Sequence, residues 1–133
     1  MAFPRERRIP LQLRLLAAVV AGLLACGIPL WPIPYQQVNM PGNPSASAWL
    51  ILGGLAGLMA GYLTRERFWP PVLAVALGFV CAVYGRVEVE TSRDPTLHNL
   101  WPFEVVIAGG IGLVAAVIGL GVARLLQRAA ATE

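Results

Sequence analysis

The side chains that could do chemistry gather between residues 86 and 104, a stretch that separates two long apolar runs. It holds the chain's single histidine. The acidic and imidazole groups of this stretch are Glu88, Glu90, Asp94, His98 and Glu104. Carboxylates and an imidazole can ligate zinc or a similar ion, and they can exchange protons with a substrate. The segment is therefore the first candidate for a metal site or an acid–base centre.

The spacing of these residues matches no metal or catalytic motif. Asp94, His98 and Glu104 could converge, but a single histidine is an incomplete ligand set, and no paired nucleophile accompanies it. Cys26 and Cys81 lie inside apolar runs and outside any CxxC pair, which favours small buried residues over redox or metal chemistry. The sequence thus predicts no catalytic residue, no bound metal and no cofactor.

A better interpretation of the segment is an ordered cap, with Arg86 and Arg93 balancing its acids, or a docking surface for another protein. Val87 and Val89 alternate with glutamates, as in a short extended stretch. A helix start is indicated near Trp101, because Pro102 suits a first helical turn and Glu104 suits the positive end of the helix dipole. The candidate docking or ligand residues are Glu88, Glu90, Asp94, His98, Trp101 and Glu104.

The elements that must position this segment are set by composition. Of the 133 residues, 57% are hydrophobic and only 13% are charged. A soluble domain carries about 25% charged residues, and so few charges could not cover a soluble surface. Lipid is the simplest solvent for the excess apolar area. The sequence predicts an all-α integral membrane protein with a lipid bilayer as its main partner, and the arginines at the run ends argue against a nucleic-acid partner.

Four apolar runs have the length that a helix needs to cross a bilayer. They predict a single domain over residues 1–133, a four-helix transmembrane bundle, with outer loops at 32–45 and 86–99. The expected helices are approximately 11–31, 46–63, 68–85 and 100–126. The first run could also be a signal peptide, but its length and the prolines after it favour a retained helix. The short turn at 64–67 predicts that the second and third helices are antiparallel neighbours.

Arginine placement predicts the orientation. All ten basic residues are arginine, which is typical of G+C-rich bacterial coding, and eight of them would share one side of the membrane if both chain ends lie in the cytoplasm. Those eight are Arg5, Arg7, Arg8, Arg14, Arg65, Arg67, Arg124 and Arg128. The positive-inside rule then gives an N-in/C-in, multi-pass protein of the cytoplasmic (inner) membrane. Tryptophans at the run ends, Trp31, Trp49, Trp69 and Trp101, fit an interfacial aromatic belt.

Small residues recur along the predicted helices. Gly53, Gly57 and Gly61 follow one another every four residues, which places them on one face of the second helix, and Gly112 belongs to a similar stripe on the fourth. Such stripes let helices approach closely. Internal packing is favoured for these helix-packing glycines, with self-association or docking on another membrane subunit as the alternative.

The middles of the four runs contain no ionisable side chain, which argues against a proton-coupled carrier built from this chain alone. The sequence therefore favours a non-enzymatic structural or accessory subunit that packs on itself, as a homo-oligomer, or on a larger membrane complex. The first alternative is a small transporter or channel formed by oligomerisation. The second is a membrane enzyme or a metal or cofactor binder that uses segment 86–104.

Overall fold

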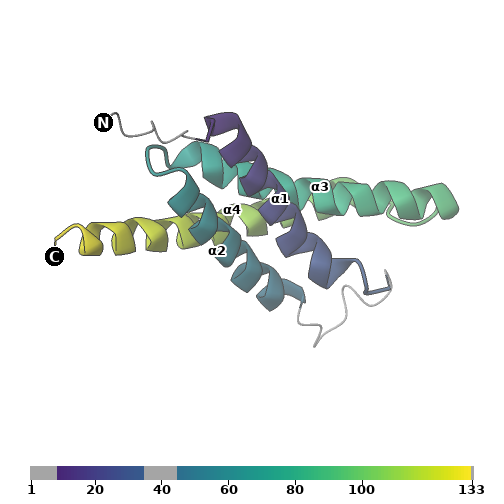
Figure 1. Ribbon diagram of the computed structural model, residues 1–133. Helices are drawn as coiled ribbons and strands as arrows, with labels where there is room; N and C mark the ends of the chain where they lie inside the picture. Colours follow the sequence, from purple (N-terminus) through teal and green to yellow (C-terminus); the bar gives the residue numbers. More distant parts are fainter. Residues whose placement is uncertain (1–8, 35–44, 133) are drawn as a thin grey trace.

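The computed structural model describes residues 9–34 and 45–132 and is built entirely of helices and their connections over those residues (Figure 1). The helices are α1 (Leu11–Leu30), α2 (Ser45–Leu63), α3 (Trp69–Arg93) and α4 (Trp101–Ala130). Each of the four is long and apolar enough to cross a membrane. The prediction of an all-helical chain with four apolar helices is therefore confirmed, and most of the predicted loop 32–45 falls outside the described residues.

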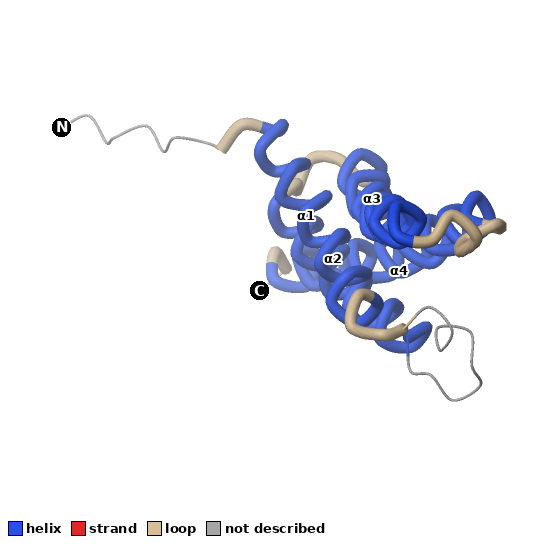
Figure 2. Tube along the Cα trace, turned by 90° about the vertical axis from the view of Figure 1, so that its right-hand side faces the viewer, coloured by secondary structure: helices blue, strands red, loops and turns tan. Residues whose placement is uncertain are grey.

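The helices form two antiparallel pairs that cross each other in two layers (Figures 1 and 2). Two hydrogen bonds tie α1 to α2, one near each end of the pair: Trp49 Nε1 donates to the Cys26 carbonyl at 3.1 Å, and Arg14 Nη1 donates to the Leu63 carbonyl at 3.1 Å. α3 and α4 make the second pair, and their first turns carry Pro70 and Pro102, where a missing N–H costs nothing.

Contacts between the layers join α1 to α3 and α2 to α4, whereas α2 and α3 touch only sparsely. The expectation that the short turn makes α2 and α3 close neighbours is therefore wrong along most of their length. The two helices diverge after the turn because each packs on a helix that is distant in sequence.

Glycines lie where the two layers cross. A side chain at Gly22 or Gly78 would collide with the backbone of the opposite helix in the α1–α3 contact, and the same holds for Gly119 against Gly54 in the α2–α4 contact. At Gly57, an added Cβ would lie 2.7 Å from the Ala116 carbonyl oxygen. Backbone cannot move aside as a flexible side chain can, so these crossings require residues without a Cβ.

The predicted packing glycines all lie inside the chain. Gly53 and Gly112 both face the ring of Phe79, which is fully buried, and Gly61 faces the Cβ of Ala123. The stripe Gly53, Gly57 and Gly61 is consequently covered by α4 and α3, and it is not a free surface of this chain.

The third helix is longer than the sequence pattern suggested. α3 continues past the predicted end at residue 85 to Arg93, and only residues 94–100 connect it to α4. The stretch from Val87 to Glu90 is helical and not extended, so the alternation of valine and glutamate misled that interpretation. The helix persists because Arg86 and Val87 are buried and Arg86 pairs with Glu90 one turn later. α4 likewise runs four residues beyond the predicted end at 126.

Candidate functional site

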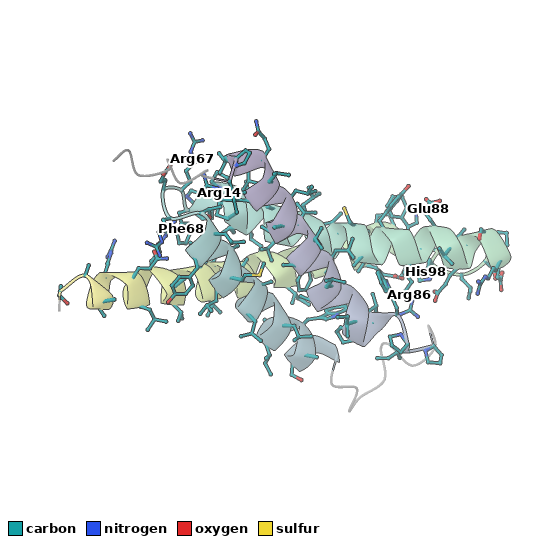
Figure 3. All side chains as sticks on the ribbon, viewed as in Figure 1. Arg14, Arg67, Phe68, Arg86, Glu88 and His98 are labelled. Atoms are coloured by element: carbon teal, nitrogen blue, oxygen red, sulfur yellow. The ribbon has the colours of Figure 1, made fainter. Side chains whose placement is uncertain are left out.

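The polar side chains collect at the two opposite ends of the molecule (Figure 3). We call the first the His98 end, comprising the end of α1, the start of α2, the last turns of α3, the 94–100 connection and the first turn of α4. We call the second the Arg124 end, comprising the start of α1, the 64–68 connection and the last turns of α4. The residues between them form an apolar, close-packed core.

Arg86 is the anchor of the His98 end. Only 7% of its surface is exposed. Its Nε donates to Glu90 Oε1 at 2.8 Å, and its Nη1 and Nη2 donate to the carbonyls of Leu30 at 2.7 Å and Ile33 at 2.6 Å. One guanidinium therefore satisfies two carbonyls at the end of α1 and fixes that end to α3.

His98 joins α3 to α4. Its Nε2 contacts Glu90 Oε2, and its Nδ1 lies 2.9 Å from Glu104 Oε2. The residue is only 3% exposed, and its backbone has a φ of 60°, which is unusual for a residue with a side chain. Arg86, Glu90, His98 and Glu104 thus form a continuous chain of contacts, which we call the Arg86–Glu104 cluster.

The Arg86–Glu104 cluster pairs basic groups with acidic ones. Both ring nitrogens of His98 lie against carboxylate oxygens, and the guanidinium of Arg86 lies against Glu90. Charged and polar groups that are removed from water are tolerated when they are paired and hydrogen-bonded in this way.

The same geometry limits the chemistry of His98. With both nitrogens occupied by carboxylates, no ring lone pair is directed at a metal or a substrate. The two carboxylates lie on opposite edges of the ring, so they cannot share one metal ion with it. Among the residues that the structure describes, no group of three or more His, Cys, Asp or Glu side chains could hold a metal ion. The arrangement is suited to holding helices together.

Of the three residues that were expected to converge, two meet in the structure. His98 and Glu104 do meet, but Asp94 does not join them, and Glu90 takes that position. Asp94 is exposed and accepts hydrogen bonds at Oδ1 from the Thr96 hydroxyl at 2.7 Å and the Thr96 amide at 2.9 Å. These bonds hold the pKa of Asp94 below its ordinary value, because they stabilise the carboxylate. Asp94 therefore organises the turn.

The other two predicted residues, Glu88 and Trp101, lie on the exposed outside of the α3–α4 pair. The Glu88 carboxylate lies near the hydroxyl of Tyr84, one turn earlier on α3. The Trp101 ring packs edge-on against Tyr84, with centroids 5.8 Å apart. These residues remain available for contact with lipid or protein, while Glu90, His98 and Glu104 are used inside the chain.

Arg86 was not predicted as a site residue, although the sequence contains a signal for it. Arg86 and Glu90 are four residues apart, the spacing of a helical ion pair, and Val83 and Val87 beside Arg86 are both buried. Interpreting 86–99 as a loop concealed that spacing.

The Arg124 end is held by an arginine in a different setting. Arg124 Nη2 donates to the carbonyls of Thr64 and Arg67, each at 2.7 Å, and its Nη1 contacts the Arg65 carbonyl. Gln127 donates to the Gly61 carbonyl at 3.3 Å. α4 thereby caps the exposed carbonyls that follow α2.

A surface pocket of about 490 Å³ opens beside this arginine. It is lined by Arg65, Glu66, Phe68, Arg124, Gln127, Arg128 and Ala131.

No known protein-family model, curated protein or solved structure significantly matches the chain.

Proposed function

We propose that this chain is a non-enzymatic, multi-pass membrane protein, a structural or accessory subunit that packs on itself or on a larger membrane complex. Its two termini lie in the cytoplasm, and its membrane is the bacterial inner membrane. The proposal is supported by the distribution of charge, by the internal packing of the helices, and by a face of α4 that no other part of the chain covers.

Charge supports the orientation. Among the described residues, the Arg124 end carries Arg14, Arg65, Arg67, Arg124 and Arg128 with one acid, Glu66. The His98 end carries Arg86 and Arg93 with Glu88, Glu90, Asp94 and Glu104. The positive-inside rule places the Arg124 end in the cytoplasm.

The packing argues for a structural role over transport or catalysis. No Asp, Glu, Lys, Arg or His occurs in residues 15–34, 45–64, 69–85 or 105–123. Transport pathways and proton relays ordinarily place such groups within the spans. The layers cross in backbone contact at their glycines, and the imidazole of His98 is enclosed between two carboxylates.

The observation that carries the proposal is a pair of glycines on the outside of α4. An added Cβ at Gly110 or Gly121 would meet nothing within 4 Å, so no contact inside the chain requires glycine there. Glycine costs a helix about 1 kcal/mol relative to alanine. The two positions are eleven residues apart, which returns them to the same face within about 20° at 3.6 residues per turn. A helix of a second subunit could approach this face closely.

This proposal is tested by enlarging the glycines of the open face. Wild-type protein extracted in mild detergent should run as an assembly by native mass spectrometry, either of several copies or with a second subunit. Gly110→Leu with Gly121→Leu should release the monomer, because two isobutyl groups would hold the partner helix away. Gly85→Leu is the matched control, since Gly85 on α3 also has open space around it.

The control separates a specific face from a general effect of adding leucine. If Gly85→Leu dissociates the assembly as strongly as the α4 variant, the α4 face has no special role. A wild-type chain that is strictly monomeric and carries no other subunit from native membranes would contradict the subunit function itself.

A further inference from the structure

The pocket at the Arg124 end is strongly basic. Three of its lining residues are Arg65, Arg124 and Arg128, against one acid, Glu66. Within residues 9–34 and 45–132, none of these arginines forms an ion pair. The pocket therefore presents positive charge that the described part of the chain does not neutralise.

Arg124 is held in place by neutral groups, which do not compensate its positive charge. Its partners are the carbonyls of the 64–68 connection and the Gln127 amide oxygen at 3.3 Å, all of which are neutral groups. Arg65 and Arg128 are exposed on either side and can adjust to a ligand. The terminal nitrogens of Arg124 are engaged by these acceptors, so Arg124 contributes its positive charge, while Arg65 and Arg128 can turn their guanidinium groups toward an anion with several acceptor oxygens, such as a phosphate group.

The surroundings of the pocket are those of a membrane surface. It lies where α2 and α3, two helices that could span a membrane, are joined by a short turn. The Phe68 ring lines it and packs edge-on against Trp69, which is 59% exposed, as aromatic residues do at the headgroup level. Leu125, the residue after Arg124 on α4, is 65% exposed, so apolar surface lies at the level of the pocket.

We propose that this pocket binds the phosphate group of an anionic phospholipid, with Arg65 and Arg128 holding the headgroup beside the charge of Arg124 and the acyl chains lying along α4. The site rests on the proposed insertion of the helices in a membrane, but it does not depend on oligomerisation. Bound in this way, the lipid would offset part of the positive charge of the Arg124 end and fix its depth in the cytoplasmic leaflet, where anionic lipids attract basic residues.

The test counts lipids on the purified chain by native mass spectrometry after titration with phosphatidylglycerol or with phosphatidylcholine. Phosphatidylglycerol should bind more tightly, because only its headgroup carries a net negative charge. Arg65→Gln with Arg128→Gln should weaken that binding about fivefold for each arginine, since a basic residue at the membrane surface contributes about 1 kcal/mol. Both side chains are exposed, so the fold should survive, and circular dichroism checks that helicity is retained.

Arg93→Gln is the matched control, because Arg93 is an exposed arginine at the opposite end. It should bind phosphatidylglycerol as the wild type does. Equal binding of the two lipids, or an equal loss in Arg93→Gln, would overturn the site. Displacement of phosphatidylglycerol by millimolar inorganic phosphate would show that the pocket takes the soluble anion, and the lipid assignment would fail. A monomeric chain that still prefers phosphatidylglycerol would contradict only the subunit proposal.

Discussion

At each end of the molecule an arginine donates hydrogen bonds to backbone carbonyls, but only one of the two arginines also pairs with a carboxylate of the chain. At the His98 end, Arg86 caps carbonyls at the end of α1, and at the Arg124 end, Arg124 caps carbonyls that follow α2. Arg86 continues into Glu90, His98 and Glu104. No described carboxylate pairs with Arg124. The charge of Arg86 is paired with a carboxylate of the chain, and the charge of Arg124 is not paired within the described residues.

Burial explains the difference between the two arginines. Arg86 is buried, and a charge removed from water is costly unless an opposite charge and hydrogen bonds compensate for it. Arg124 is only partly buried and opens onto a surface pocket, so water or an external anion can solvate it. The comparison teaches that carbonyl capping fixes an arginine in place, while the depth of burial decides whether the chain must also supply its counter-ion.

Removing the buried arginine should cause the largest loss of stability. Arg86→Met leaves the Leu30 and Ile33 carbonyls without their donor and leaves Glu90 as an unbalanced acid. Breaking a buried ion pair from one side costs about 4 kcal/mol, and we expect a loss of that order in the free energy of unfolding. Denaturant titration in detergent, followed by tryptophan fluorescence, measures it. Arg93→Met, at an exposed position, should change the free energy of unfolding little. An equal loss there would show that Arg86 contributes no more to stability than an exposed arginine does.

The second largest effect should come from His98. His98→Ala loses hydrogen bonds to Glu90 and Glu104 and keeps a backbone conformation that disfavours side chains, so we expect a loss of about 3 kcal/mol. His98→Gly loses the same bonds but adopts a φ of 60° freely, and it should be about 1 kcal/mol more stable than His98→Ala. Unfolding titrations of both variants measure the difference. If the alanine variant is the more stable of the two, the strain at this position is not relieved by glycine.

A smaller effect is expected at the opposite end. Arg124→Gln removes the donors to the Thr64 and Arg67 carbonyls, but these groups lie near the surface, where water can replace the lost bonds. We expect a loss of about 1.5 kcal/mol, the range for a few partly exposed hydrogen bonds. The same unfolding titration applies, and proteolysis at the 64–68 connection should increase. A loss as large as that of Arg86→Met would contradict the contrast between the two ends.

The existence and type of the helices could be predicted because each run is long, apolar and free of charge in its middle. Their arrangement could not. The short 64–67 turn suggested that α2 and α3 are neighbours, but the close contacts form where glycines on distant helices admit another backbone, such as Gly22 with Gly78. Which small-residue faces match each other depends on three-dimensional fit, and no single helix carries that information.

The polar cluster forms within the segment that the sequence singled out, but its members partly differ from the expected ones. His98 and Glu104 were placed together correctly, but treating 86–99 as a loop removed the helical spacing that brings Arg86 and Glu90 onto one face. The polar residues there resemble a loop by composition. The end of α3 is helical because Arg86 donates to the Leu30 carbonyl on α1 and because His98 contacts Glu90, and both of these contacts are tertiary. The sequence pattern suggested that Asp94 joins the cluster, but Asp94 instead accepts a hydrogen bond from Thr96 within the same turn.

Asp94 should give the smallest effect and the one with a defined pH dependence. Its pKa is lowered from the ordinary 3.8 by the side-chain and backbone hydrogen bonds of Thr96, so the folded state favours the carboxylate. The stabilisation is present above that ordinary pKa and is lost as the pH falls through the lowered pKa of the folded state. Asp94→Asn should therefore be slightly less stable than wild type at pH 7, and the difference should shrink below pH 3.8 as the wild-type carboxyl is protonated. Thr96→Val removes one of the two donors, so the same Asp94→Asn change should matter less in that background. A difference that does not vary with pH would show that the charge of the Asp94 carboxylate does not stabilise the turn.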